Sequence, residues 1–484
     1  VLATVMPAID TTIANVALPS MGGSMSASTE QIAWVLTSYI VGVALMTPIS
    51  GWLALKFGRK RVFLFSVIGF TLASGLCGAA QNLWEVILLR ALQGAIGAPI
   101  GPLSQAVILD TFEPEERGPA LAAWSMGMMA APILGPVLGG YLTETFDWRW
   151  VFYINLPVGI VATMGVVAFI PDNESDAGAR FDFFGFALLG LFVVALQLML
   201  DRGQANDWFD SREIVVYGML AATGLYLFAV HLLTARQTIL PIAMFRDRNF
   251  VTTTVLQLLI GVSTFSAMAL TPPLMQNLMG YPVEAAGWAL APRGVASLFS
   301  SYIAGRLVGK VDDRLLILFG LCMFALSFWQ MSGSAPDIDD SIIIISGLVL
   351  GFGSGFIFIP LTTLGFATLQ PHLRAQATSF SSLFRNMGQS VGISILIAYY
   401  TRQAQAMHAQ LADYAAPDNP LMRSTALAPW YDLTSAGGLA ALNAEVSRQA
   451  SMAAYAQAFH LLFLLSLAMT SLLLLLRRPG RIRV

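Results

Sequence analysis

The chain has 484 residues, of which 56% are hydrophobic and 11% are charged, and its formal net charge at pH 7 is -2. Soluble domains contain roughly 25% charged residues, so a soluble protein of this length could not cover its surface with so few charges. A protein that crosses a membrane many times is the class that fits, because lipid accepts apolar surface. The small net charge also argues against a nucleic-acid partner.

The cysteines and histidines predict neither a disulfide framework nor a metal site. Cys77 and Cys322 each lie inside an apolar run, and the four histidines are far apart. Disulfide scaffolds and metal sites need closer and more regular spacing. The chain begins without methionine and in the middle of an apolar pattern, so we expect the first span to lack its start and identify no signal peptide there.

Fourteen segments are long and apolar enough to cross a bilayer core of about 30 Å, which takes about 20 helical residues. In chain order they are residues 1–19, 32–54, 62–80, 85–109, 119–141, 151–170, 183–200, 213–233, 250–272, 285–308, 314–332, 341–369, 376–400 and 453–476. An even number of spans places both ends of the chain on one side.

The distribution of lysines and arginines predicts which side this is. About seventeen of them lie in connections on the side of the N-terminus, and about six lie in connections on the opposite side. The positive-inside rule therefore predicts that both termini are cytoplasmic. The three others, Arg90, Arg293 and Arg385, lie within predicted spans.

The spans divide into three groups. Residues 1–170 are predicted to form one six-helix bundle and residues 250–477 a second, with two inserted helices in residues 183–233. An inner turn at residues 51–60 is echoed by one at residues 305–314, as expected for two related halves. Transporters built from such repeats bind substrate at mid-membrane between them. A long outer loop covers residues 401–452, and its stretch from Arg402 to Ala415 has an amphipathic helical pattern.

Asp10 is the carboxylate that lies well inside a predicted span. A charge at mid-bilayer costs at least about 2.5–3.5 kcal/mol, so such residues are usually functional. At 1.5 Å per residue, Asp10 lies about 15 Å below the outer end of its span and Arg90 about 9 Å below the outer end of the fourth. An ion pair is therefore within reach, and a pair that separates would couple proton binding to conformation. A static structural pair is the alternative.

The fifth span carries a face of small residues. Ala131, Gly135 and Gly139 follow at intervals of four, with Pro136 and Gly140 beside them. Such a face lets another backbone approach closely, and proline permits a bend. Glycines at 347, 351 and 355 repeat the spacing in the twelfth span. The alternative to a conformational role is ordinary helix packing.

No pattern supplies an enzyme or an ATP site. Residues 305–310 resemble a P-loop but are one residue short and lack the following Ser or Thr. Active transport by this chain would therefore draw on an ion gradient and need no cofactor. A membrane enzyme or a receptor that does not transport is a further alternative, although an enzyme in lipid would need a cluster of polar catalytic groups that the sequence does not show.

Four sequence motifs resemble those of a known family, and the resemblance extends over nearly the whole chain. Residues 9–19 read I-D-T-T-I-A-N-V-A-L-P, residues 89–94 read L-R-A-L-Q-G, residues 135–140 read G-P-V-L-G-G and residues 148–157 read W-R-W-V-F-Y-I-N-L-P. In this order they resemble the first-helix motif, motif B, antiporter motif C and the entry to helix 6 of the fourteen-helix drug:proton antiporters of the major facilitator superfamily.

The resemblance implies roles for individual residues. Asp10 and Arg90 would take part in proton coupling, and Gly135, Pro136, Gly139 and Gly140 would shape the inward-to-outward transition. The long outer loop resembles that of exporters which work with a periplasmic adaptor and an outer-membrane channel. The family's motif A is represented by Gly51, Gly58 and Arg59, but Leu55 and Lys56 replace its usual acid and base. Asp110 is expected to pair with Arg59 instead; two solvated loop charges are the alternative.

The sequence thus predicts an inner-membrane antiporter that exchanges protons for hydrophobic or amphipathic drugs. A proton-coupled exporter of one metabolite, siderophore or lipid is the alternative. Candidate substrate contacts are Asn15, Gln93, Arg293 and Arg385. For each of these a purely structural role is the alternative; for Arg293 that role is a long basic side chain that extends toward a membrane interface.

Overall fold

The computed structural model describes residues 1–113, 116–172, 178, 180–235, 238–333, 340–414, 431 and 435–477. These residues form helices joined by turns, and the extended pairing among them is one isolated bridge between Val308 and Val311. The expected all-helical class is confirmed.

The first group of helices covers residues 1–170. They are α1 (Leu2–Ser24), α2 (Thr29–Met46), α3 (Ser50–Phe57), α4 (Arg59–Ala79), α5 (Leu83–Gly97), α6 (Ile100–Thr111), α7 (Arg117–Thr145), α8 (Trp150–Tyr153) and α9 (Asn155–Phe169). Local caps fix several of their starts. Ser28 and Gln31 form a capping box at α2, and Asn82 accepts a hydrogen bond from the backbone N–H of Glu85 at α5.

The remaining helices follow in the same order. They are α10 (Phe183–Gly203), η1 (Trp208–Asp210), α11 (Arg212–Thr234), α12 (Ile242–Phe245), α13 (Arg248–Pro273), η2 (Leu274–Leu278), α14 (Val283–Leu307), α15 (Asp313–Ser332), α16 (Asp340–Ala367), η3 (Pro371–Leu373), α17 (Arg374–Tyr414), α18 (Ala436–Leu472) and η4 (Leu473–Leu475). Aspartates at 182, 247 and 312 cap α10, α13 and α15 by accepting a backbone N–H.

Every predicted span coincides with one long helix or with consecutive helices. Within the described residues, ten helices are long and apolar enough to cross a membrane, and the pair α2–α3, bent by 54°, is an eleventh candidate. The predicted segments 119–141, 285–308 and 376–400 also form long helices, α7, α14 and α17, which are not among these candidates. The number of fourteen spans therefore stays a prediction.

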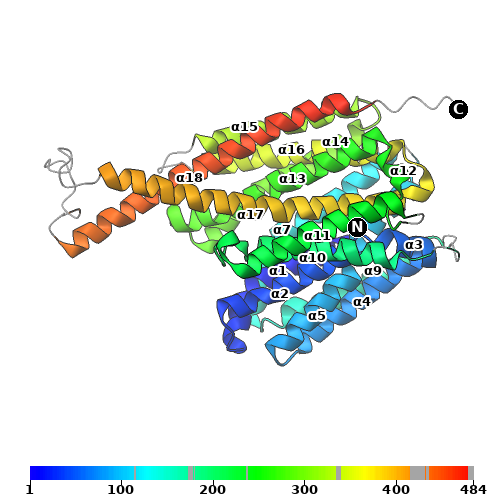
Figure 1. The fold of residues 1–484 in the computed structure, drawn as a ribbon, viewed down its shortest axis with the longest axis horizontal. Coiled ribbons are helices and arrows are strands. Elements are labelled where there is room, and N and C mark those ends of the chain that lie inside the picture. The colour runs from blue at the N-terminus through cyan, green and yellow to red at the C-terminus, as the bar shows by residue number, and fades with distance from the viewer. Residues whose placement is uncertain are drawn as a thin grey trace.

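The helices pack side by side in a bundle. In Figure 1 the blue and cyan helices of the first group lie together, the green to red helices α13–α18 lie on the other side, and α10 and α11 lie between. One buried apolar cluster belongs to α13–α18 and one to α1–α9, and a third consists of residues of α1–α9 together with Ala375 of α17. A fourth draws residues from both groups and from α10, so the two groups share an apolar contact. The domain boundaries predicted from sequence remain a prediction.

The predicted outer loop is largely helical where it is described. The stretch predicted as an amphipathic helix, from Arg402, is a continuation of α17 that reaches Tyr414, and α18 begins at Ala436, well before the predicted span starts at residue 453. Figure 1 shows both helices extending beyond the rest of the bundle. His408 and Asn443 join them by a side-chain hydrogen bond of 3.0 Å. Ala415 and the following residues to 430 lie outside the described part.

Candidate functional site

A buried ion pair lies in the first group of helices. Asp10 on α1 is 1% exposed and Arg90 on α5 is fully buried, and 2.5 Å separates Asp10 Oδ2 from Arg90 Nη1. The guanidinium lies 4.2 Å from the ring centre of Tyr39 and 5.5 Å from that of Phe152, and its Nε donates to the backbone carbonyl of Val35. Two aromatic faces and one carboxylate therefore stabilise the charge of Arg90 away from water.

Two amide side chains complete the surroundings of Asp10. Gln93 Nε2 donates to Asp10 Oδ1 at 3.1 Å, and Asn155 Nδ2 donates to the same oxygen at 2.8 Å. Arg90 Nη1 also donates to Gln93 Oε1 at 2.8 Å, and Asn155 contacts Ser74 Oγ at 3.0 Å. Both oxygens of the carboxylate thus accept hydrogen bonds from side-chain donors. We call Asp10, Arg90, Gln93 and Asn155 the Asp10 cluster.

Sequence reasoning placed three members of this cluster near one another and missed the fourth. Arg90 and Gln93 are three residues apart, so they share a face of α5. Gly94, next to them, lets α5 approach α2, because an added Cβ would meet the carbonyl oxygen of Tyr39. Asn155 is the first residue of α9 and 2% exposed. In the sequence, Asn155 is an amide residue inside the apolar run 151–170, and it was interpreted only as part of a family motif.

The small-residue face of α7 packs against α1 one turn beyond Asp10. A Cβ added at Gly135 would collide with the side chain of Thr12, and one added at Gly139 would lie 3.2 Å from the carbonyl oxygen of Ile13. Thr12 Oγ1 also donates to the carbonyl of Ala131 at 3.4 Å. The two helices are therefore held close where α1 carries the acid.

The other two residues of motif C are not part of that contact as far as the structure describes them. A Cβ added at Gly140 would meet nothing within 4 Å. Pro136 lies within the continuous helix α7, and its side chain is outside the described atoms. In the second group, the repeated spacing packs α16 on α14: an added Cβ at Gly351 would meet the carbonyl oxygen of Arg293, and one at Gly355 would meet Ser300.

A second ionic cluster lies at the end of the bundle that the charge pattern assigns to the cytoplasm. Asp110, at the end of α6, forms ion pairs with Arg59 of α4 and with Arg374 at the start of α17; the distance to Arg374 Nη1 is 3.0 Å. The acid is 21% exposed and the arginines 15% and 13%. We call these three residues the Asp110 latch, because they join the first group of helices to the second. Arg374 was counted from sequence only as a loop charge.

The glycines of motif A serve the same junction. Gly58 has φ 88°, a left-handed conformation that allows the tight turn from α3 into α4. A Cβ added at Gly51 would lie 2.5 Å from the backbone of Gln376, so α3 and α17 touch there. Leu55, in the usual place of the acid, is 36% exposed, and the latch carboxylate comes from Asp110. Lys56 lies next to Leu55 at the end of α3.

The remaining predicted substrate contacts are not in the Asp10 cluster. Asn15 is an exposed residue of α1. Arg293 of α14 and Arg385 of α17 are half-buried, and Arg293 Nη2 lies 3.4 Å from the carbonyl oxygen of Thr264 on α13. Only Gln93 of the four predicted contacts therefore touches the acid.

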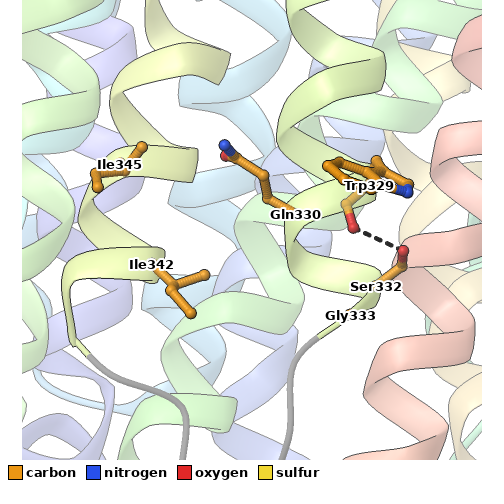
Figure 2. A pocket seen from close by; sticks show the side chains of 6 residues that line it. All are labelled: Trp329, Gln330, Ser332, Gly333, Ile342 and Ile345. Carbon is orange, nitrogen blue, oxygen red and sulfur yellow. Dashed lines mark hydrogen bonds between the residues drawn. The ribbon is translucent and has the colours of Figure 1, made fainter.

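A shallow, open pocket lies elsewhere, between α15 and α16. Its volume is about 300 Å³, and Figure 2 shows Gln330 extending between the two helices toward Ile345, with Trp329 and Ser332 on the α15 side. None of the predicted site residues lines it. Within the described residues no group of three or more His, Cys, Asp and Glu side chains is arranged to hold a metal ion.

Known proteins resemble this chain in sequence and in fold. The description of the matching family is Major Facilitator Superfamily, over residues 1–393. The multidrug export protein EmrB of Escherichia coli K12 is 37% identical over 87% of this chain and 82% of its own length. The fatty acid resistance protein FarB of Neisseria gonorrhoeae is 35% identical over 88% of this chain and 84% of its own.

Among solved structures, the human organic anion transporter MFSD10 superposes with a TM-score of 0.61 at 12% identity, covering 96% of this chain and 97% of that one. The proton:xylose symporter XylE gives 0.59 at 14% identity, covering 96% and 92%. These two likenesses concern the fold. Together with the sequence matches they show that the chain belongs to the Major Facilitator Superfamily and is a multi-span membrane transporter related to multidrug exporters.

Proposed function

We propose that this protein is a proton-coupled antiporter that exports hydrophobic or amphipathic drugs by alternating access. Its relatives' names support drug export, and the Asp10 cluster supports the coupling to protons. An acid buried in a membrane helix is costly to keep unless it works, and this one is surrounded by donors. That buried, ion-paired carboxylate is the observation that carries the proposal.

The cluster explains how a proton could change the conformation. A proton on Asp10 cancels the charge that Arg90 now faces at 2.5 Å and leaves the buried guanidinium without its counter-charge. Arg90 then gains from any movement that brings it to water or to another acceptor. In the outward-facing state protonation would thus favour substrate release, and loss of the proton toward the cytoplasm would restore the pair and binding.

The contacts of α1 offer a path from the acid to the other half of the transporter. The chain packs α1 against the small-residue face of α7, and α7 packs against α14. At the cytoplasmic end the Asp110 latch and Gly51 hold α3 and α6 against α17. A shift of α1 at Asp10 would therefore affect the interface between the first and second groups of helices, which the Asp110 latch keeps closed.

The proton gradient is sufficient as the energy source, so the proposal includes no cofactor. One charge crossing the full potential releases about 2.3 kcal/mol per 100 mV, or roughly a 50-fold concentration ratio. We propose that the protein lies in the bacterial inner membrane with both termini in the cytoplasm. The extended arm of α17 and α18 would then reach into the periplasm and offer a surface to an adaptor that leads to an outer-membrane channel.

The test is drug-driven proton release in proteoliposomes with a pH gradient. Asp10→Asn keeps the size of the side chain but cannot ionise, so we expect coupled transport to be lost. Arg90→Gln should reduce it strongly. Asp147→Asn is the matched control, because Asp147 makes an exposed ion pair with Arg149. Full drug-driven proton release by Asp10→Asn would refute the proposal.

A dedicated exporter of one lipid, metabolite or siderophore is the second candidate. The name of FarB, a fatty acid resistance protein, favours the lipid within that group. A panel of dyes, antibiotics and fatty acids in the same vesicles separates the two. Transport of a single chemical class would support the dedicated exporter, whereas transport of unrelated structures would support the multidrug function.

A further inference from the structure

Two arginines lie at mid-membrane in the second group of helices. Arg293 is ten residues from the outer start of α14, and Arg385 is eleven residues from the cytoplasmic start of α17. At 1.5 Å per residue these positions are about 15 and 16 Å deep, which is half of a bilayer core of about 30 Å. Both side chains are half-buried.

Neither arginine has an acid partner in the part of the chain that the structure describes, because no carboxylate there lies within 4 Å of Arg293 or Arg385. The sequence gives the reason: α13 contains no Asp or Glu, and the acids of α14, α16 and α17 lie toward their outer ends. Arg90, in contrast, is neutralised by Asp10. An unpaired guanidinium at this depth is costly, so such a charge usually faces a water-filled path or a ligand.

Both arginines border the same turn of α13. An added Cβ at Gly261 would lie 2.6 Å from the carbonyl oxygen of Arg385, and Arg293 Nη2 lies 3.4 Å from the carbonyl of Thr264. Thr264 is only 8% exposed, and its Oγ1 has no hydrogen-bond partner within the described part of the chain. A buried hydroxyl donor without an acceptor thus lies beside the Arg293 guanidinium.

Arg293 does not face lipid. The large exposed apolar residues of α14 are Trp288, Val295, Phe299 and Tyr302, which are 70%, 62%, 62% and 45% exposed and follow one stripe of the helix. Arg293 precedes Val295 by two residues, about 200° around the helix. Its exposed fraction therefore lies on the side of the helix that faces the protein.

We propose that Arg293 and Arg385, with the hydroxyl of Thr264, bind the anionic head group of an amphipathic substrate, a carboxylate or a sulfonate. A guanidinium matches such a head group because it offers parallel N–H donors to two oxygens. The substrate then supplies the counter-charge that the protein lacks at this depth. This inference rests on the proposed export function and narrows its substrate class to anionic amphiphiles.

The experiment measures equilibrium binding in lipid nanodiscs without any gradient. The probes are dansyl-labelled undecanoate and a dansyl-labelled alkyl trimethylammonium of the same chain length. We expect the parent protein to bind the carboxylate at least about tenfold more tightly than the ammonium. Arg293→Gln and Arg385→Gln should each weaken carboxylate binding by about tenfold or more while leaving the ammonium unchanged or tighter. Arg293→Lys should lie between, because it keeps the charge but not the parallel donors.

Arg306→Gln is the matched control, because Arg306 is an exposed residue of α14 that stacks over Tyr302. It should leave the preference intact. Equal affinity of the parent for both probes, or an unchanged preference in both Gln variants, would overturn the inference. If a Gln variant does not fold, Arg293→Lys and the comparison of the two probes in the parent protein still decide the inference.

The binding assay separates the inference from the proposed function. Asp10→Asn should keep the carboxylate preference while losing proton-coupled transport. Transport without a head-group preference would overturn the inference alone. A carboxylate preference in a parent protein without proton-driven flux would refute the coupling alone.

Discussion

Removing the charge of Asp110 should open the predicted cytoplasmic end of the bundle. Asp110→Asn abolishes two ion pairs that join α6 to α4 and to α17, with little change in volume. The three side chains are 13–21% exposed, so their interaction lies between that of surface pairs, about 0.2–1 kcal/mol, and the loss of one partner of a buried pair, about 3–5 kcal/mol. A loss of about 1–3 kcal/mol changes the ratio of closed to open states by about 5- to 150-fold.

The assay is a distance measurement between spin labels at the cytoplasmic end. Phe57→Cys on α3 and Val311→Cys before α15 place the labels at exposed positions, 51% and 39%, in a background in which Cys77 and Cys322 are replaced by serine. We expect the parent protein to show mainly the short distance and Asp110→Asn to show a second, longer population.

The control is Asp172→Asn, which alters a carboxylate that is 85% exposed and 3.7 Å from Lys60. This exposed pair should contribute little, because water screens it. Its distance distribution should match that of the parent. An unchanged distribution in Asp110→Asn, or the same second population in Asp172→Asn, would contradict the role assigned to the latch.

Two further variants test the packing around Asp10. Gly135→Ala should lower the thermal unfolding midpoint and slow transport, because overpacking against Thr12 costs about 1–3 kcal/mol. Gly140→Ala is the control and should behave like the parent, because its added methyl group meets open space. Equal effects of the two substitutions would contradict the α1–α7 contact. Asn155→Ala removes the donor to Asp10 and should cost about 1.5–3 kcal/mol of unfolding free energy, measured by denaturation in detergent. Asn206→Ala is the control, because the side-chain nitrogen of Asn206 has no hydrogen-bond partner among the described residues. An equally large loss of unfolding free energy in Asn206→Ala would contradict the stabilising role of the hydrogen bond from Asn155 to Asp10.

The sequence predicted the elements that depend on local pattern. Long apolar runs identified the helices, because a membrane helix satisfies its own backbone and needs only apolar side chains. The encounter of Asp10 with Arg90 was also predictable, since helical rise fixes depth within a span and the two residues differ by about one turn. The bend between α2 and α3 was not predicted, nor was the continuity of α17 with the predicted amphipathic helix from Arg402, because hydropathy marks where lipid begins rather than where a helix ends.

Contacts between distant segments were the harder part of the site. Asn155 reaches Asp10 only because α9 packs across α1, and Arg374 reaches Asp110 only because α17 lies against α6. Nothing near either residue in the sequence records that packing. Of the long-range partners that were predicted, Asp10 and Arg90 came from charges that lipid penalises, and Asp110 and Arg59 came from the family resemblance. Amides and end-of-helix arginines are tolerated in many places and carry a weaker signal.

The charge of Arg90 in the first half is paired with Asp10, whereas Arg293 and Arg385 in the second half have no such pairing among the described residues. This difference fits separate tasks for the two halves. In the first half the charge of Arg90 is balanced inside the protein, so a proton that arrives at Asp10 disturbs a neutral cluster. In the second half no carboxylate of the described residues balances Arg293 or Arg385, and the proposed anionic substrate would supply the counter-charge. Exchange of one entering proton for one leaving anion moves two charges in the direction that a negative cell interior favours. Each contributes about 2.3 kcal/mol per 100 mV. An exporter with unpaired arginines in its second half would therefore draw about twice as much from the membrane potential with an anionic substrate as with a neutral one.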